Sequence, residues 1–496
     1  TEAIDLQQKM LMPGINDMHQ HPVEGGAKEL FECQFPFTAG PDEIAAAIAG
    51  CVAAQPDAEW IRGGQFSSDF FVQNPMESPR EWLDKVSGDK AVALIDDAYH
   101  NAWLNSKALE KLGVTSEKDL PKGVEMHNDP SGKPDGFMIE AFGFVKDRLH
   151  WTPEQYEQSA AKAVELAHSF GITGLKATAI GDYELAAFKA LADSGNLSAH
   201  VAGAIVTPYG HRENVLDIDE LKSKREQYKA PNFNTNFVKI FMDGVPTAAR
   251  TAAMLAPYTP AEEGGEQTSG QLHISAEMLE TDLVALDAAG FTVKIHTAGD
   301  RSVQVALDAI ESARKKNGDS GLRHELAHAG YVGDDDMNRF AELGAIPDFS
   351  PYIWFPSPIM DSVLTAVGER GEFYWPTKSL LASGALVSAG SDWPAAVPSM
   401  NPWPGIEAMV TRADPFANGE STLWADEAVP LQDALHIFTS NGAKALLIDD
   451  KSGSVALGKS ADFIVLNQDL FKVPATQISD TQVLMTYFGG EKVYSR

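Results

Sequence analysis

Residues that bind metals or move protons recur at the ends of short apolar runs along this chain. His19 and His21 stand two positions apart in MPGINDMHQHP, a spacing that places both imidazoles on one face of an extended segment. Lys239 lies inside the apolar run FVKIFMDG, where an unpaired ammonium group would be costly to bury. Each residue alone has an ordinary structural explanation, but together they favour one shared site. The set is completed by His296 in TVKIHTAGD, His328 in RHELAHA and Asp392 in VSAGSDWP.

The runs that carry these residues are rich in β-branched side chains and alternate with amphipathic stretches, the pattern of a parallel α/β sheet. Residues 153–171 and 275–290 are typical of the intervening helices, and Thr152 and Pro153 are the predicted start of the first. Eight such strands predict a (β/α)8 TIM barrel, whose active site forms at the carboxyl ends of the strands. The predicted strands are residues 11–21, 171–180, 197–206, 237–244, 291–299, 323–329, 345–351 and 385–394.

Two further parts are predicted outside a barrel that spans residues 13–450. Residues 22–150 are too many for a strand-to-helix loop and contain their own apolar runs, so we interpret them as a subdomain inserted over the barrel mouth. Residues 451–496 predict a small β-sandwich module, to which residues 1–12 would add a strand. Because such a module needs several strands, an N-terminal part of it is expected to be missing.

The composition restricts the partners. In 496 residues, 39 Lys and Arg face 70 Asp and Glu, giving a formal charge of −31 that repels nucleic acid and anionic membranes. No apolar run approaches the roughly 18 residues of a membrane-spanning helix. Nucleic acid and membranes are therefore poor partners. A small-molecule substrate is the expected partner, and a homo-oligomer is left open.

Cysteine usage bears on the cellular compartment. Cys33 and Cys51 make neither a disulfide framework nor a zinc cluster, and we interpret both as buried or idle thiols. The expected location is the cytoplasm. Because the chain begins with Thr1 rather than Met, a secreted or periplasmic location with a removed leader is left open.

Over nearly its whole length the chain resembles the amidohydrolase superfamily, in the amidohydrolase family 3 branch that contains N-substituted formamide deformylases. The resemblance runs through MPGINDMHQHP, ALIDDAYHNAWLNSKAL, VKIFMDGV, KIHTAGDR, RHELAHA, AGSDWP and ALGKSADFIVL. It implies a metal-bridging role for Lys239 and a catalytic, metal-contacting Asp392. The metal ligands that it implies are His19, His21, His296 and His328.

The donor types agree with that implication. Neutral imidazoles and carboxylates suit Zn²⁺, with manganese or iron as alternatives, as one ion or two. Such an ion can lower the pKa of a bound water from ~15.7 to ~7 and polarise a carbonyl group. Asp392 would take the water's proton as general base and return it to the leaving nitrogen.

Lys239 needs a neutral or anionic form beside such an ion. A lysine ammonium about 5 Å from a divalent ion would be repelled by roughly 7 kcal/mol at an effective dielectric constant of ~20. Two forms avoid this repulsion: a deprotonated amine, or a carbamate formed with CO₂. The carbamate can hold two ions, and we expect it here.

Several other residues are candidates for contacting a substrate. His100, in DDAYHNAWLNS, could donate to the substrate carbonyl as a catalytic and binding residue, or could simply fix its own loop. His324 opens its predicted strand and is interpreted as structural, and Asp300 as a residue that orients ligands. The other predicted substrate contacts are Trp103, Asp243, Trp354 and Trp393, where Asp243 could instead orient metal ligands and core packing is the alternative for the tryptophans.

The predicted function is hydrolysis of a C–N bond, of the amide or formamide type, in a small organic substrate. Hydrolysis of esters, phosphotriesters, ureas or ring amides on the same site is the nearest alternative. A catalytically silent barrel that binds metal for regulation is another, and the carboxylate of Asp392 argues against it, because a silent barrel has no need of that group.

Overall fold

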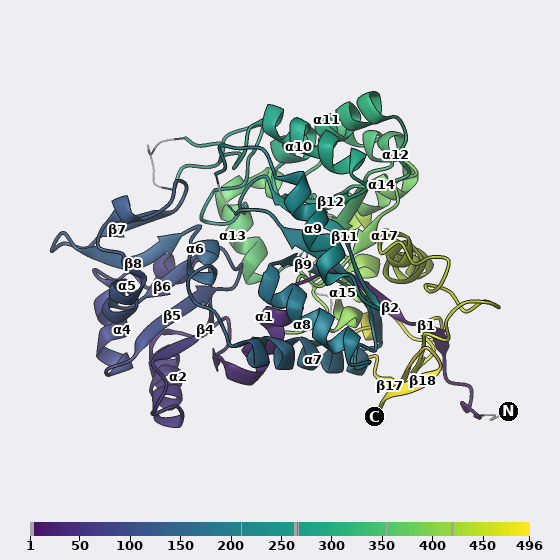
Figure 1. Ribbon diagram of the computed structural model, residues 1–496, viewed down its shortest axis with the longest axis horizontal. Coiled ribbons are helices and arrows are strands. Elements are labelled where there is room, and N and C mark those ends of the chain that lie inside the picture. Colours follow the sequence, from purple (N-terminus) through teal and green to yellow (C-terminus); the bar gives the residue numbers. More distant parts are fainter. Residues whose placement is uncertain are drawn as a thin grey trace.

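The computed structural model describes residues 4–209, 211–261, 265, 267–353, 355–395, 397–417 and 421–496 (Figure 1). Three sheets organise these residues: an eight-stranded parallel sheet in the middle of Figure 1, a six-stranded sheet on its left and a four-stranded sheet at its lower right. Candidate site residues come mainly from the first sheet and from the loops that follow its strands.

The central sheet is the predicted (β/α)8 barrel. The segment that follows its last strand closes the barrel against the first strand through backbone hydrogen bonds from Asp392 N to His19 O at 2.7 Å and from His21 N to Trp393 O at 2.8 Å. Gly390 permits this approach, because a Cβ there would lie 2.2 Å from His19 N. In spatial order the strands are β2 (Ile15–Gln20), β9 (Ile172–Ile180), β10 (His200–Val206), β11 (Phe233–Phe241), β12 (Thr292–Thr297), β13 (Glu325–His328), β14 (Ile346–Phe349) and β15 (Ser388–Ala389).

Helices cover the outside of this barrel. The predicted start of the first is confirmed: Thr152 Oγ1 accepts from Gln155 N at 3.2 Å, and Gln155 Oε1 accepts from Thr152 N at 3.0 Å. The α-helices of residues 153–450 are α7 (Pro153–Ser169), α8 (Asp182–Asp193), α9 (Ile218–Tyr228), α10 (Ala276–Ala288), α11 (Asp300–Asn317), α12 (Arg339–Leu343), α13 (Pro358–Val367), α14 (Thr377–Ala382), α15 (Pro402–Thr411), α16 (Leu431–His436) and α17 (Gly442–Ala445).

The predicted strand over residues 11–21 is two strands. Leu11–Pro13 is β1, which pairs antiparallel with β16 (Phe463–Leu466) in the four-stranded sheet, whereas β2 belongs to the barrel. The break falls at Gly14, where a Cβ would lie 2.0 Å from Thr173 Oγ1. The chain thus changes sheets where only glycine fits against β9.

The second sheet lies within residues 22–150. Its outer strand β3 (Cys33–Gln34) and its neighbours β4 (Trp60–Phe66) and β5 (Ala91–Asp96) are parallel, and the remaining strands are antiparallel: β6 (Ala102–Leu104), β8 (Pro134–Ile139) and β7 (Glu125–Asn128). The helices of this segment are α1 (Pro22–Phe31), α2 (Pro41–Ala54), α3 (Phe70–Gln73), α4 (Pro79–Ser87), α5 (Ser106–Leu112) and α6 (Phe142–Lys146). Helix α1 packs on α7 of the barrel.

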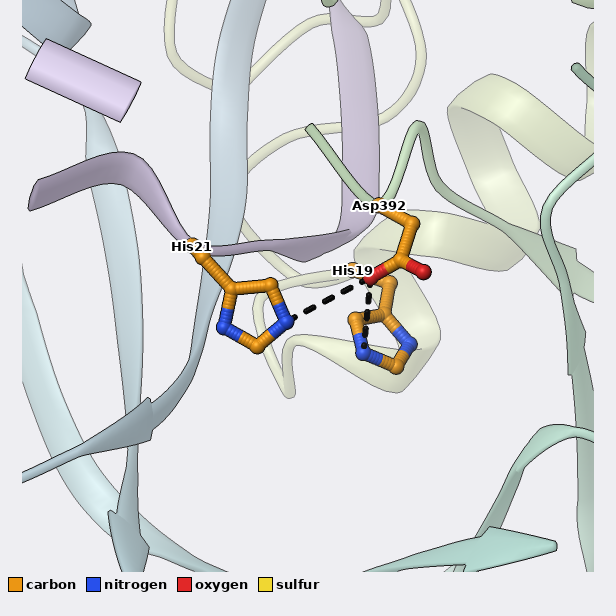
Figure 2. A group of neighbouring side chains, drawn as sticks. All are labelled: His19, His21 and Asp392. Carbon is orange, nitrogen blue, oxygen red and sulfur yellow. Dashed lines mark ion pairs between the residues drawn. The ribbon is translucent and has the colours of Figure 1, made fainter. Parts of the chain in front are cut away.

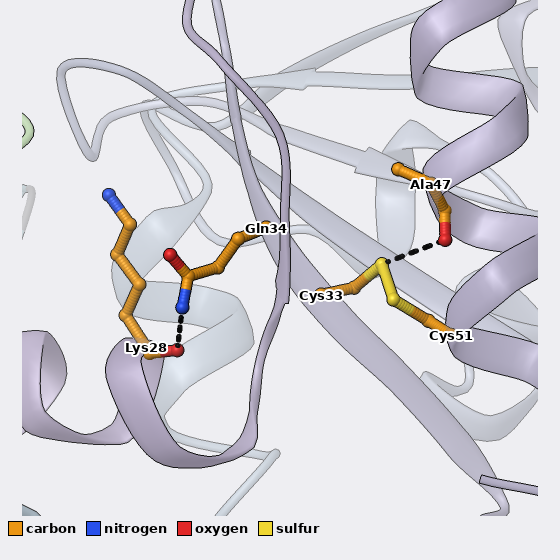
Figure 3. The surroundings of a disulfide bond; sticks show 5 residues. All are labelled: Lys28, Cys33, Gln34, Ala47 and Cys51. Carbon is orange, nitrogen blue, oxygen red and sulfur yellow. Dashed lines mark hydrogen bonds between the residues drawn. A yellow bond between two sulfur atoms is a disulfide. The ribbon is translucent and has the colours of Figure 1, made fainter. Parts of the chain in front are cut away.

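The interpretation of both cysteines as idle thiols is wrong. Cys33 on β3 and Cys51 near the end of α2 form a disulfide (Figure 3). The strand and helix lie side by side, which brings together two residues separated by 18 positions. The separation of the two cysteines in the sequence does not predict that they lie close together, because their distance depends on how α2 packs on the sheet.

The third sheet joins both ends of the chain. It has the order β1, β16, β17 (Val483–Phe488) and β18 (Glu491–Ser495), all antiparallel. His200 at the start of β10 contacts Asp462, just before β16, through Nε2 and Oδ2 at 2.9 Å. Among the described residues, no helix is both long and apolar enough to cross a membrane.

Candidate metal centre

A cavity of about 680 Å³ opens at the carboxyl ends of the barrel strands. Part of its wall comes from residues 67–69 and 97–100, which belong to the segment carrying the six-stranded sheet. The side chains singled out in the sequence for metal chemistry share this cavity: His19, His21, Lys239, His296, His328 and Asp392.

His19, His21 and Asp392 form the tightest group (Figure 2). His19 Nε2 and His21 Nε2 lie 3.5 Å and 3.4 Å from Asp392 Oδ1. One donor atom from each residue can be chosen such that all three lie within 4.8 Å of one another. His19 on β2 and His21 just after it both turn their imidazoles toward Asp392, as the i, i+2 spacing predicts.

His296 and His328 stand beside this group on the neighbouring strands β12 and β13. The His328 ring centroid lies 4.8 Å from that of His19 and 4.7 Å from that of His296. His296 Nε2 is 3.0 Å from Gly244 O, so it donates there and leaves Nδ1 as the lone-pair nitrogen. His328 and Asp392 have φ values of 70° and 63°, in the left-handed region that only a small fraction of non-glycine residues adopt.

Burial controls the charge of these groups. It holds the pKa values of His19, His296 and His328 well below the ordinary value, and nearby cationic groups act in the same direction. Burial, followed by the charge of Lys294, lowers the pKa of Lys239 to about 7. The imidazoles are therefore neutral at neutral pH, the form that binds metals.

A buried network of charged side chains contacts His19 at Nδ1. Asp348 Oδ2 lies 3.2 Å from His19 Nδ1 and 2.6 Å from Lys294 Nζ, which also donates to Glu325 Oε2 at 3.0 Å. Glu325 pairs in turn with Lys176. Because Nδ1 faces Asp348, the nitrogen that His19 presents to the cavity is Nε2. Sequence reasoning missed these residues, although charges inside apolar strands are the signal that singled out Lys239.

Comparison with known proteins adds to this geometry. A model described as the amidohydrolase family matches residues 2–494. The chain belongs to the amidohydrolase family.

Relatives span the full length of this amidohydrolase. Protein LONG AFTER FAR-RED 3 of Arabidopsis thaliana is 28% identical over 512 residues, which cover 100% of this chain and 84% of that protein. The N-substituted formamide deformylase of Arthrobacter pascens is 27% identical over 510 residues, covering 100% and 90%. An uncharacterized metal-dependent hydrolase from Pyrococcus horikoshii has a similar structure, with a TM-score of 0.73 and 25% identity over 96% of this chain and 89% of that one.

Other predicted substrate contacts of the amidohydrolase lie elsewhere. Trp103 is in the core of the six-stranded sheet and donates to Pro79 O at 2.9 Å, and Trp393 packs in the barrel core. Asp243 accepts from the backbone amides of Ala253, Ala298 and Gly299. None of the three is among the described residues that line the cavity, so their positions lend no support to substrate contact.

The remaining predictions have mixed outcomes. Asp243 Oδ1 lies 3.8 Å from His296 Nε2, so this carboxylate holds the loop that follows β12 close to a candidate ligand. Trp354 lies outside the described residues. His324 bonds Asp287 through Nε2 at 3.0 Å, and its Nδ1 accepts from Val293 N at 3.1 Å, a structural arrangement. Asp300 Oδ1 accepts from Leu255 N at 2.7 Å, which fixes a loop of the amidohydrolase.

His100 does line the cavity, and residues that the sequence did not reveal surround it. Its Nδ1 lies 2.8 Å from Glu140 Oε2 and 3.0 Å from the Tyr209 hydroxyl oxygen. Its ring centroid is 5.8 Å from that of His296. Burial would lower the pKa of His100, but Glu140 raises it above the ordinary value. No spacing rule connects positions 100, 140 and 209, so only the fold could reveal this cluster.

Proposed function

We propose that this amidohydrolase is a metal-dependent hydrolase that cleaves a C–N bond, of the amide or formamide type, in a small organic molecule. The observation that carries the proposal is the convergence of four imidazoles, one lysine and one carboxylate on the wall of one cavity. The likeness to an N-substituted formamide deformylase, at 27% identity over the whole chain, supports the bond type.

The donor set fits a divalent transition ion. Three of the imidazoles have depressed pKa values, and Asp348 and Gly244 O occupy the far nitrogens of His19 and His296. We infer zinc, with manganese or iron as alternatives, held by His19, His21, His296, His328 and Asp392 as one ion or two. When bound, the ion supplies a Lewis acid that makes water acidic and polarises the scissile carbonyl.

Asp392 moves the proton in this proposal. Its side chain is 11% exposed and stands between the imidazoles, where a water molecule and a substrate carbonyl can both reach it. Asp392 accepts the proton of the attacking water as the oxygen–carbon bond forms, and delivers that proton to the nitrogen as the carbon–nitrogen bond breaks.

Lys239 is proposed to be carbamylated. Its amine, 1% exposed on β11, would attack CO₂ and lose one proton, giving an N-carboxylate with two oxygens. The neutral amine thereby becomes an anion beside the histidines, and the repulsion that a lysine ammonium would exert on a divalent ion is absent. The carbamate would supply two oxygen donors for the proposed ion or ions, whereas a free amine would supply a single nitrogen donor.

The test of the proposed function is a panel of N-formyl and N-acyl amines, with matched esters and ring amides, assayed with and without added Zn²⁺. We expect turnover of at least one open-chain amide and its loss after chelation. Elemental analysis of the same preparation should give about one or two equivalents of transition metal per chain. Less than about a tenth of an equivalent, with activity untouched by a strong chelator, would contradict the proposal.

A further inference from the structure

Three side chains converge on the carboxylate of Glu140 beside the cavity. His100 Nδ1 lies 2.8 Å from Oε2, the Tyr209 hydroxyl donates to Oε2 at 2.7 Å, and the Thr251 hydroxyl donates to Oε1 at 2.7 Å. Tyr209 O is also 3.0 Å from His100 Nδ1, so these groups form a closed ring of contacts. Glu140 is 4% exposed, and its carboxylate is satisfied on both oxygens.

These residues come from four separate parts of the chain. His100 lies between β5 and β6, and Glu140 directly follows β8, so both belong to the six-stranded sheet. Tyr209 follows β10 and Thr251 follows β11, so both belong to the barrel. Glu140 thus lies where the two sheets meet around the cavity, and both His100 and Tyr209 line that cavity.

The backbone of His100 is held equally firmly. Asp96 Oδ1 accepts from His100 N and from Asn101 N, each at 2.9 Å, and Asn101 Oδ1 accepts from Glu140 N at 3.1 Å. His100 O accepts from Phe142 N at 3.0 Å. With the main chain and Nδ1 both fixed, the ring has one nitrogen left for a bound molecule, Nε2.

We propose that Glu140 and Tyr209 are positioning residues that fix the His100 ring, so that Nε2–H donates a hydrogen bond to the carbonyl oxygen of the substrate. This inference rests on the proposed function. As the water oxygen bonds to the carbonyl carbon, the π pair moves onto the carbonyl oxygen, and the His100 donor stabilises that charge. The pair returns to re-form C=O when the C–N bond breaks, so His100 keeps its proton throughout. A preorganised donor of this kind contributes roughly 10²–10³-fold to kcat.

A double-mutant cycle tests whether Glu140 acts through His100. With the best substrate of the panel, we expect His100→Ala to lower kcat by roughly 10²-fold and Glu140→Gln by roughly tenfold to a hundredfold, with smaller changes in KM. In the His100→Ala background, Glu140→Gln should lower kcat by less than about threefold, because the ring it positions is gone. Equal factors in both backgrounds would show a purely structural carboxylate and overturn the proposal.

The matched control is another histidine–carboxylate pair, with a buried carboxylate, that joins the barrel to a different sheet. His200 and Asp462 lie 2.9 Å apart, and neither is among the described residues that line the cavity. Asp462→Asn should therefore lower stability and leave kcat unchanged. If it lowers kcat as much as Glu140→Gln does, general loosening of the fold explains both results and the positioning role is wrong.

A spectroscopic arm separates this inference from the proposed function. In ¹⁵N-histidine-labelled protein, with His100→Gln used for assignment, Nδ1 of His100 should carry a proton in the wild type and change its signal in Glu140→Gln. Tyr209→Phe should shift the same signal. If no substrate of the panel is turned over, the proposed function is contradicted. The spectroscopic measurement would still decide whether Glu140 fixes the His100 ring. An Nδ1 signal that neither variant moves would overturn the inference.

Discussion

Asp392 stands where three histidines meet, immediately past the last barrel strand. Its Oδ1 faces His19 and His21, and its Oδ2 lies 4.0 Å from His328 Nδ1. Its φ of 63° is a conformation that costs a non-glycine residue on the order of 1 kcal/mol or more. The backbone hydrogen bond from Asp392 N to His19 O holds Asp392 in this position. The same hydrogen bond therefore helps to close the barrel and to place the carboxylate.

The first prediction concerns that carboxylate. Asp392→Asn keeps the shape and removes the proton acceptor, so kcat should fall by roughly 10²-fold or more. Steady-state kinetics and metal analysis on the same preparations check it. A variant that keeps its metal and most of its kcat would show that Asp392 is not the base.

The second concerns Lys239. Lys239→Ala should lose activity and regain part of it with added short carboxylic acids, because a carboxylate can occupy the space that the carbamate would fill. Chloride at the same ionic strength is the control and should rescue nothing. In a well-resolved map of the wild type, a bare amine beside a single, fully occupied metal ion would refute the carbamate.

At the scale of elements, four barrel strands carry charges into the barrel interior. Lys176 on β9, Lys294 on β12, Glu325 on β13 and Asp348 on β14 are all fully buried and paired. Ser388 on β15 donates to Asp348 Oδ1 at 2.8 Å. The network therefore crosses five strands and ends at His19, which couples the register of the barrel to the orientation of a candidate ligand.

The third prediction tests this coupling. Glu325→Gln removes the charge shared by Lys176 and Lys294 and should destabilise the fold by roughly 3–5 kcal/mol, as breaking a buried ion pair does. Denaturant midpoints measure it. Glu165→Gln is the control, an exposed partner of Lys162 whose loss should change stability by less than about 1 kcal/mol. Equal midpoints for Glu325→Gln and wild type would contradict the coupling.

The fourth concerns the disulfide between β3 and α2. Closing a loop of 18 positions stabilises the segment by roughly 3 kcal/mol through the entropy of the unfolded chain. The double change Cys33→Ser and Cys51→Ser should lower the melting temperature, and a reductant should lower only that of the wild type. Two titratable thiols in non-reduced, unfolded wild-type protein would show that the bond does not form.

At the scale of the whole molecule, three sheets meet through polar pairs whose carboxylates are buried. His200 and Asp462 join the barrel to the four-stranded sheet, as Glu140 joins it to the six-stranded one. Burial would raise the pKa of Asp462, but hydrogen bonds from His200, Gly489 N and Ser460 lower it to about 2.

The fifth prediction follows from that shift. Because the pKa of Asp462 in the folded protein lies below the ~3.9 of an unfolded aspartate, its contribution to stability is present above about pH 4. It is lost as the pH falls toward about 2. The difference in denaturant midpoint between wild type and Asp462→Asn should therefore be largest near pH 7 and shrink between pH 4 and 2. A difference that is constant with pH would contradict this role.

The sequence alone determined the barrel and the residues at its rim. Strand and helix periods are local, so eight alternating runs predict eight parallel strands, and the carboxyl ends of those strands share one face. His19, His21, Lys239, His296, His328 and Asp392 could be singled out for this reason, and all line one cavity.

Only the tertiary structure decided how the rest of the cavity is built. The disulfide, the Asp348 network and the Glu140 cluster join residues whose separation in sequence carries no periodic signal. Trp103 and Trp393 illustrate the same limit, because an aromatic residue near a motif can face either the core or the cavity. Which way it faces is set by packing between elements, which local sequence does not encode.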